Sequence, residues 1–107
     1  MMLELSHAGT WLPICDASVL TPGRGMAALL PDGAQAALFQ DRTGRLYAID
    51  NRDPFTGAQV LSRGLLGSAA GRLFVASPLL KQRFDLETGR CLDDEDVSVA
   101  VFPVRSS

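Results

Sequence analysis

The sequence predicts a small all-β domain, a sandwich or small barrel of short antiparallel strands. Three observations support this fold class. Short runs of alternating apolar and polar residues dominate the chain, and pairs of turn-forming residues separate them at close spacing. The clearest pairs are Asp32-Gly33, Thr43-Gly44 and Thr88-Gly89. Helix is only weakly indicated, and there is no internal repeat, low-complexity tract or linker.

The start of the chain carries the weakest signals. We expect residues 1–9, MMLELSHAG, to be a frayed end that contains the only histidine, His7. Residues 11–15 then form a first short strand. Residues 17–23 have room for one helical turn before Pro22 stops it.

A hairpin and a third strand follow. Residues 26–30 and 34–40 flank Asp32-Gly33, which is a strong hairpin signal, and the next turn leads into a strand at 45–50. Alternate side chains of that strand point to opposite faces of its sheet. One face carries Leu46 and Ala48, and the other carries Tyr47 and Ile49.

The C-terminal half continues the same pattern. A strand at 72–77 follows the turn GSAAG. Residues 82–86 and 90–92 flank another turn and predict a hairpin. Residues 98–105 alternate again, and Pro103 within them suits a strand at the edge of a sheet.

Size and composition limit the classes of function. The 107 residues have room for one domain, covering 1–107, and a hydrophobic fraction of 47% with 7% aromatics predicts a mostly aliphatic core. A net charge of -2 argues against nucleic acid, which usually selects a basic face. No apolar run approaches the ~18 residues that span a membrane, and the start lacks a basic secretory signal. We expect a soluble cytoplasmic protein.

Catalytic and metal-binding patterns are missing. Cys15 and Cys91 are the only cysteines, and their spacing matches no zinc site. We expect two reduced, partly buried thiols, with a disulfide as the alternative. The acidic run at 93–96 lacks the EF-hand spacing and predicts a solvated loop. A serine or cysteine catalytic triad needs a histidine, and the only histidine lies in the N-terminal segment, so no such triad is expected.

Two central segments carry the most specific pattern, LYAIDNRDPFTGAQVLSRG at 46–64 and LFVASPLLKQRFDLETG at 73–89. In Rieske proteins the corresponding loops carry C-P-H and C-P-x-H, the second followed by G-x-x-F-D-x-x-T-G. Here D-P-F and S-P-L-L stand at these places, and the F-D-x-x-T-G run is intact. The four ligand positions hold Asp53, Phe55, Ser77 and Leu80.

From Trp11 to Val104 the chain resembles the NirD family, the Rieske-like small subunits of assimilatory NAD(P)H-dependent nitrite reductase. The resemblance implies a Rieske-like sandwich with a cluster-type insert at about 50–84. A Rieske centre needs two thiolates and two imidazoles. Because the ligand positions offer neither group, we expect no catalytic residue, cofactor or metal in this chain. The resemblance also implies a large subunit with FAD, a [4Fe–4S] cluster and siroheme, which this chain binds and supports while nitrite is reduced to ammonium.

The ligand positions admit several structural roles. Phe55 and Leu80 could pack together and fill the cluster space, or one or both could stay exposed and dock against another subunit. A mixed arrangement would bury Leu80 and leave Phe55 partly exposed. We expect Asp53 and Ser77 to cap loop backbone groups, since one carboxylate and one hydroxyl make a poor metal site.

Four basic residues lie near the same loops: Arg52, Arg63, Lys81 and Arg83. They could be ordinary solvated charges. They could also form a cationic rim that steers an acidic partner surface, or, as a weaker idea, attract an anion such as nitrite. The candidate partner-binding residues are therefore Phe55, Arg63, Lys81 and Arg83.

Two other classes of function stay open. One is a Rieske-type ferredoxin, which would carry electrons and would be coloured by its cluster. The missing ligands argue against this function. A stand-alone protein-binding or regulatory module would be colourless and would have a different partner.

Overall fold

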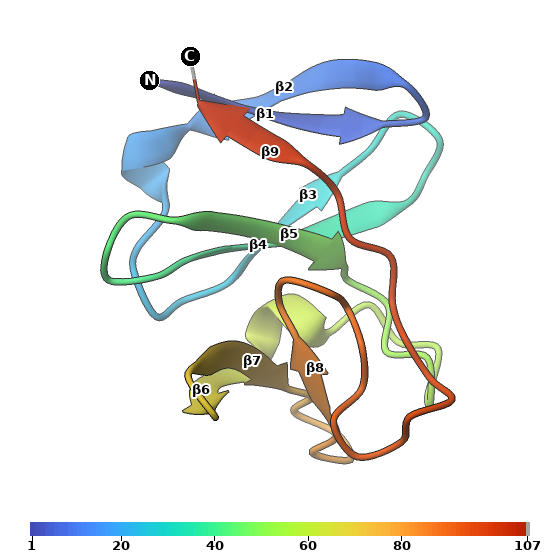
Figure 1. Ribbon diagram of the computed structural model, residues 1–107. Coiled ribbons are helices and arrows are strands. Elements are labelled where there is room, and N and C mark those ends of the chain that lie inside the picture. Colours follow the sequence, from blue (N-terminus) through green and yellow to red (C-terminus); the bar gives the residue numbers. More distant parts are fainter. Residues whose placement is uncertain (107) are drawn as a thin grey trace.

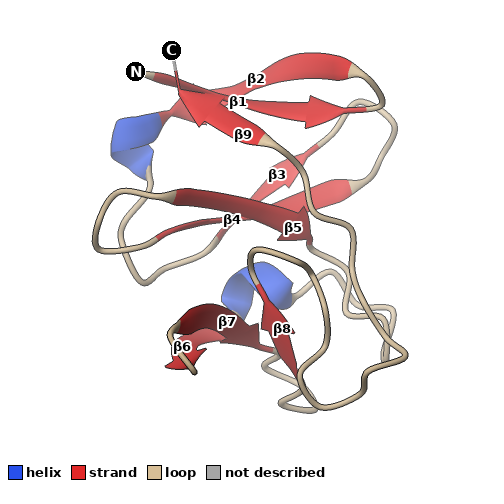
Figure 2. Ribbon diagram, in the orientation of Figure 1, coloured by secondary structure: helices blue, strands red, loops and turns tan. Residues whose placement is uncertain are grey.

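The computed structural model describes residues 1–106, which form an upper and a lower half in Figure 1. The upper half comprises residues 1–50 and 100–106, and the lower half residues 51–99. Over the described residues there are three small antiparallel sheets of three strands each, and the helical elements are two short 3₁₀ turns (Figure 2). The predicted all-β fold class is confirmed.

The first sheet closes the top of the molecule. It consists of β1 (Met2–His7), β2 (Thr10–Asp16) and β9 (Val104–Ser106), in the order β2-β1-β9. Pairing of β1 with β9 places the two chain ends side by side (Figure 1). The expectation of a frayed N-terminus is therefore wrong. Leu3 and Leu5 alternate with polar residues and are fully buried, and this period-two pattern holds the segment as a strand.

The middle sheet belongs to the upper half, and one of its faces packs on the lower half. It consists of β3 (Met26–Leu29), β4 (Gln35–Gln40) and β5 (Leu46–Asp50), in that order. The predicted hairpin between β3 and β4 is confirmed. The predicted alternation in β5 is also confirmed, because Leu46 and Ala48 face the upper core while Tyr47 and Ile49 face the lower one. The expected helical turn before Pro22 is the 3₁₀ turn η1 (Ala17–Val19).

The lower sheet consists of β6 (Leu65–Ala69), β7 (Arg72–Ala76) and β8 (Arg83–Asp85), and the turn η2 (Leu61–Arg63) precedes it. The prediction that GSAAG is wholly a turn is wrong. Only Ala70 and Gly71 turn, with φ of 52° and 78°, and the three residues before them belong to β6. Two consecutive positive φ angles are typical of the tight turn that joins antiparallel strands.

The predicted hairpin at 82–92 is present, with Cys91 bridging to Phe84. The single strand expected at 98–105 is wrong in part. Ser98 bridges to a residue of the lower half, Val101 bridges to Ile49, and only then does the chain enter β9. The segment has three separate partners because it climbs from the lower half to the upper half (Figure 1).

A buried cluster lies on each side of the middle sheet. The upper core consists of aliphatic side chains: Leu3, Leu5, Leu20, Leu30, Ala36, Leu38 and Ala48. The lower core also contains aromatic rings and consists of Ala37, Phe39, Tyr47, Ile49, Leu61, Val75, Phe84, Leu86, Cys91 and Val99. Within residues 1–106 no helix is long and apolar enough to cross a membrane.

Candidate functional site

The candidate site is the pair of loops that carry the degenerate ligand positions. Asn51 anchors the base of the first loop, residues 51–60, to the middle sheet. Its side chain is 1% exposed, donates to the Gln35 amide oxygen over 3.0 Å and accepts from the Ser62 backbone over 2.7 Å. Its own carbonyl accepts from the backbone of Val60 and Leu61. The loop therefore leaves and rejoins the fold at one fixed residue.

Asp53 organises the tip of the first loop. Its backbone N–H donates to the Ala58 carbonyl over 2.8 Å, and its carbonyl accepts from Gly57 over 2.7 Å. One carboxylate oxygen, Oδ1, accepts from the Phe55 N–H over 2.8 Å. Gly57 has a φ of 80°, a conformation that glycine adopts without steric cost. These bonds make the loop a closed hairpin.

Ser77 organises the second loop, residues 77–82, in a similar way. Its N–H donates to the Gln82 carbonyl over 2.9 Å, and its carbonyl accepts from Lys81 over 3.1 Å. Its hydroxyl accepts from the Leu79 N–H over 3.3 Å. Lys81 stands where the Rieske pattern has glycine and keeps a positive φ of 67°. The left-handed conformation of that position is therefore kept by a lysine, although glycine adopts it more easily.

The two loops are joined by a direct hydrogen bond at the former thiolate positions. The Ser77 hydroxyl donates to Asp53 Oδ2 over 2.5 Å, and both residues are 0% exposed. The prediction that these side chains cap backbone groups is confirmed. The hydrogen bond between the two side chains was not predicted. The residue types could have indicated it, because a hydroxyl at one former thiolate position can donate to a carboxylate at the other.

The two former imidazole positions differ from each other. Phe55 is half-buried and packs on the lower core, with its ring centroid 6.3 Å from that of Phe84. Leu80 is 56% exposed beside Leu79, which is 49% exposed. Leu80 therefore does not fill the cluster space, and the mixed arrangement with Leu80 buried is wrong. The Asp53–Ser77 bond joins the loops directly, and the Phe55 ring packs beside it on the lower core.

The basic residues separate into two kinds. Arg52, Arg63 and Lys81 are exposed. Arg83 instead pairs with Asp93, with Nη2 2.8 Å from Oδ1, and its guanidinium lies over the Phe74 ring. This hydrogen-bonded guanidinium lowers the pKa of Asp93. Arg83 is therefore not a free charge of the cationic rim, and the acidic run is anchored at its first residue.

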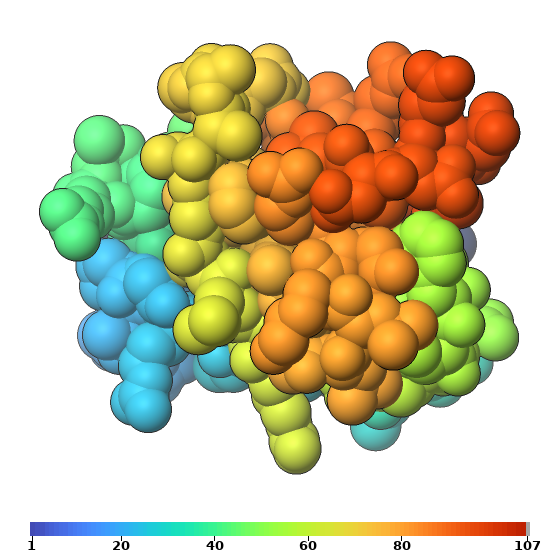
Figure 3. Space-filling view, turned by 90° about the horizontal axis from the view of Figure 1, so that it is seen from below, coloured from blue at the N-terminus to red at the C-terminus, as the bar shows by residue number. Residues whose placement is uncertain are grey.

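Figure 3 shows the lower face on which these loops lie. The second loop, in orange, lies between the first loop, in lime, and the β6–β7 hairpin, in yellow. We call Phe55, Leu79 and Leu80, with Arg52, Arg63 and Lys81 around them, the loop tip. Its leucines are held outward by loops whose backbone and buried side chains are fixed, so the apolar surface is preorganised.

A second polar cluster holds the β8 hairpin against the rest of the fold. Asp85, from the intact F-D-x-x-T-G run, is 3% exposed and binds Arg72 through Nε over 2.5 Å. It also accepts from the backbone of Glu87 and Thr88. The Arg72 hydrogen bond is the main reason that the pKa of Asp85 lies below its usual value. Glu87 continues the cluster to Arg45 at the start of β5.

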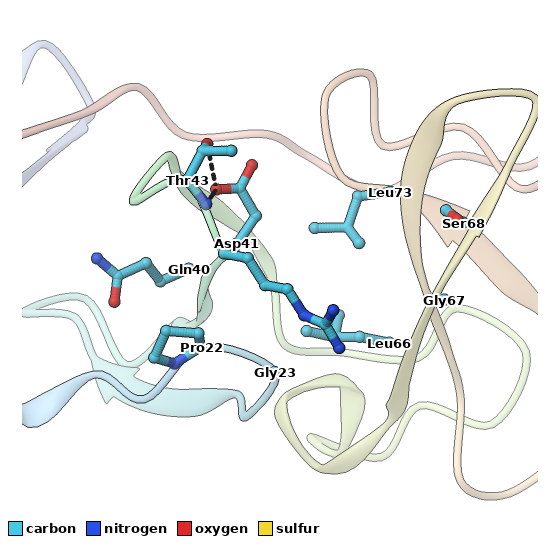
Figure 4. A pocket seen from close by; sticks show the side chains of 10 residues that line it. Pro22, Gly23, Gln40, Asp41, Thr43, Leu66, Gly67, Ser68 and Leu73 are labelled. Carbon is cyan, nitrogen blue, oxygen red and sulfur yellow. Dashed lines mark hydrogen bonds between the residues drawn. The ribbon is translucent and has the colours of Figure 1, made fainter.

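A groove of about 620 Å³ lies between β6 and the turn that follows β4 (Figure 4). Pro22 lies on one wall, and Leu66 and Leu73 lie on the other (Figure 4). Arg42 also lines it. Sequence reasoning missed the groove because its walls come from segments far apart in the chain.

The donor atoms at the loop pair do not fit a Rieske centre. Such a centre takes two thiolates and two imidazoles, and the four positions present a carboxylate, a hydroxyl and two hydrocarbon side chains. The two oxygen ligands are already bonded to each other. Cys15 lies in β2 and Cys91 in the lower core, away from both loops. Residues 1–106 contain no group of three His, Cys, Asp or Glu side chains placed to hold a metal.

The fold and the loop pair define a Rieske-like domain. The family described as "Rieske-like [2Fe-2S] domain" matches residues 10–107, and the chain belongs to this family. The nitrite reductase (NADH) small subunit of Salmonella typhimurium is 46% identical over 96 residues, which are 89% of this chain and 88% of that one. Within the Rieske-like family the chain therefore belongs to the nitrite reductase small subunits, and the predicted resemblance is confirmed.

A solved structure agrees with this assignment. The NMR structure of the Escherichia coli protein NirD superposes with a TM-score of 0.83 at 43% identity, over 92% of this chain and 89% of that one. A further relative carries the same unit inside a longer polypeptide. It is the nitrite reductase [NAD(P)H] large subunit of Klebsiella oxytoca, which is 45% identical over 89% of this chain and 10% of its own length.

Proposed function

We propose that this chain is the small, non-redox subunit of a cytoplasmic NAD(P)H-dependent nitrite reductase, and that it binds and supports the catalytic large subunit. The observation that carries the proposal is the close likeness to nitrite reductase small subunits over almost the whole chain. The Klebsiella oxytoca relative adds support, because a unit fused into a large subunit has that subunit as a permanent neighbour. Two free thiols are consistent with a reducing compartment.

The proposed role requires no catalytic group in this chain. A partner that binds only the folded, active form of the large subunit stabilises that form by mass action. The large subunit is expected to hold FAD, a [4Fe–4S] cluster and siroheme and to reduce nitrite to ammonium in nitrate assimilation. Electrons would then pass within the large subunit, and the small subunit would order or stabilise it.

The loop tip is the proposed docking surface. Exposed leucines on fixed loops bury apolar area at little entropic cost, and a half-buried aromatic beside them is a typical interface anchor. Arg52, Arg63 and Lys81 would steer an acidic partner surface, whereas Arg83 would act indirectly by holding the adjacent loop. In this proposal residues 1–107 act as one Rieske-like domain, and the cluster-type insert at about 50–84 supplies the docking loops.

The test compares nitrite reduction by the cognate large subunit with and without this chain. We expect the chain to raise activity or its lifetime, and the double variant Leu79→Ser/Leu80→Ser to bind roughly tenfold more weakly or worse, since two exposed anchors lose their apolar area. Leu29→Ser is the matched control, because Leu29 is 74% exposed on the upper half. Equal binding by both variants would remove the loop tip from the interface.

A separate experiment tests the cationic rim. Arg63→Ala/Lys81→Ala should slow association at low salt and have little effect at high salt, because screened charges no longer steer. Arg24→Ala/Arg90→Ala removes two exposed arginines that lie outside the loop tip and serves as the control. Failure of the unmodified chain to bind the large subunit at all would contradict the proposed function as a whole.

A further inference from the structure

Strand β6 ends the lower sheet, whose order is β6-β7-β8, so one of its edges has no neighbouring strand. The tight turn at 70–71 makes Ala69 and Arg72 a hydrogen-bonded pair, and such pairs alternate along an antiparallel ladder. Gly67 and Leu65 therefore bond to β7. The N–H and C=O groups of Leu66 and Ser68 point outward from the sheet.

This edge lacks the protection that other edges of the molecule have. Proteins usually guard an exposed edge with a proline, a charge or a very short strand. Among the edge strands described in residues 1–106, β2 contains Pro13, β9 has three residues and contains Arg105, and β3 has only four residues. Strand β8 has three residues, and β5 is bridged by Val101 at Ile49. Strand β6 has five residues, LLGSA, without charge or proline. It is therefore the edge best suited to pair with another strand.

The groove of about 620 Å³ runs beside this edge (Figure 4). Leu66, Leu73 and Pro22 give it apolar walls, and Arg42 supplies a positive charge. Asp41 also lines the groove, but its carboxylate is already bonded to Thr43 and to the Arg45 backbone. Within residues 1–106 Arg42 forms no ion pair, whereas the neighbouring Arg45 and Arg72 are both held by Glu87. The groove thus offers room for alternate side chains of an added strand and a charge that favours an acidic one.

We propose that β6 accepts an extended segment of the large subunit as a fourth strand of the lower sheet, with an acidic side chain of that segment facing Arg42. The proposal rests on the proposed function and adds a second contact to the loop tip. Leu65 pairs with Ala76, the residue before the second loop, so the edge begins where the loop tip ends. Strand addition draws affinity from backbone hydrogen bonds and specificity from alternate side chains.

A second copy of this chain is a poorer occupant. Strand β6 carries no acidic residue, so a β6–β6 pair would leave both copies of Arg42 without a counter-charge along the shared strands. In the Klebsiella oxytoca relative the same unit lies within a large-subunit polypeptide, so large-subunit segments are its permanent neighbours, and this favours such a segment as the occupant.

The test measures amide hydrogen exchange of each residue in this chain, alone and in the complex with the cognate large subunit. We expect the outward amides of Leu66 and Ser68 to exchange rapidly in the free chain and at least about 100-fold more slowly in the complex. Gly67 should already be protected in the free chain. Binding of the large subunit with no change at Leu66 and Ser68 would overturn the added strand and leave the proposed function intact.

Substitutions provide a second, independent readout. Ser68→Pro removes an outward N–H that the β6–β7 ladder does not use, and Ser68→Thr keeps it as the matched control. We expect the proline variant to bind roughly tenfold more weakly and the threonine variant to bind normally. A tenfold change in Kd is about the contribution of one hydrogen bond. Arg42→Glu should weaken binding similarly, with Arg24→Glu as the control.

Each remaining outcome is informative. Equal affinity for Ser68→Pro and Ser68→Thr, both folded by thermal unfolding, would overturn the proposal. Protection of Leu66 and Ser68 that appears in the free chain as its concentration rises would identify a β6–β6 dimer and would also overturn it. Absence of any complex with the large subunit would contradict the proposed function first, because no strand could then be added.

Discussion

The two halves of the molecule are held together by different chemistry. The upper core is hydrocarbon from Leu3 to Ala48. Within residues 1–106 every buried polar or charged residue lies between 51 and 85: Asn51, Asp53, Ser62, Ser77 and Asp85. The side chains of Asn51, Asp53, Ser77 and Asp85 all hydrogen-bond to loop backbone, and Asp53 and Ser77 also bond to each other. The backbone N–H of Ser62 donates to the Asn51 side chain.

The comparison shows what replaces a metal cross-link. A hydrocarbon core tolerates changes of shape but does not fix the position of a loop, whereas a satisfied hydrogen bond fixes both distance and direction. In the lower half the second loop depends on such bonds, since Leu79 and Leu80 are exposed and do not pack in the core. The Asp53–Ser77 bond joins the two loops where a Rieske protein would place iron.

The largest effect is expected in the hydrocarbon half. Leu38→Ala should lower the free energy of unfolding by about 2–5 kcal/mol, because it removes a side chain that is 1% exposed and leaves a cavity. Denaturant unfolding measures the loss. Leu29→Ala on the neighbouring strand removes an exposed leucine and should change stability by less than about 0.5 kcal/mol. Similar losses for both would contradict the assignment of the upper core.

A smaller and more local effect is expected at the loop cross-link. Asp53→Ala leaves the buried Ser77 hydroxyl and the Phe55 N–H without their acceptor, which should cost about 1–3 kcal/mol. Amide exchange should accelerate in the two loops and remain unchanged in the upper sheet. Asp94→Ala, in the exposed acidic loop, is the control.

A double-mutant cycle isolates the bond itself. If Asp53 and Ser77 act as a pair, the loss for Asp53→Ala/Ser77→Ala should be smaller than the sum of the single losses by about 0.5–3 kcal/mol. Strictly additive losses would show that the loops are held by other contacts.

The Asp85–Arg72 pair predicts a pH dependence. Because the folded-state pKa of Asp85 is lowered, mainly by Arg72, its contribution is complete above the unfolded-state pKa and is lost as the pH falls through the folded-state value. Stability of the unmodified protein should therefore decline below about pH 4, the ordinary range of aspartate. Arg72→Gln should reduce stability at pH 7 and flatten this decline. An unchanged slope, with Arg90→Gln as the control, would contradict the pairing.

The smallest effect on stability is expected at the loop tip. Leu79→Ser/Leu80→Ser should change the free energy of unfolding by less than about 0.5 kcal/mol, because both side chains are about half exposed. The same variant is expected to weaken docking. A large loss of stability in the isolated chain would show that these leucines serve the fold instead of a partner.

The difference between the halves also explains what the sequence could predict. The period of two in β5 assigned Leu46 and Ala48 to one face and Tyr47 and Ile49 to the other, because successive side chains of a strand point to opposite faces. The same pattern is present at Leu3 and Leu5, and burial of both leucines outweighs the tendency of a terminal segment to fray. Strand β6 was not predicted, because Gly67, Ser68 and Ala69 are small residues that are typical of turns. In the folded chain Gly67 lies against the Phe74 ring, where a Cβ would not fit.

The sequence predicted which residues make up the site but not how their side chains are arranged. The pattern placed Asp53, Phe55, Ser77 and Leu80 at the ligand positions, but only coordinates show that two of them bond, one packs on Phe84 and one faces solvent. The pairing of Arg83 with Asp93 and the groove beside β6 depend on residues that meet only after folding. Local pattern carries no information on such contacts.

We infer that the Asp53–Ser77 hydrogen bond, and not iron, joins the two loops of this Rieske-like chain. The most direct measurement is iron and acid-labile sulfide content, with electron paramagnetic resonance after reduction, on protein isolated and reconstituted under anaerobic conditions. We expect a colourless protein without a stoichiometric cluster. A [2Fe–2S] signal at one cluster per chain would contradict it.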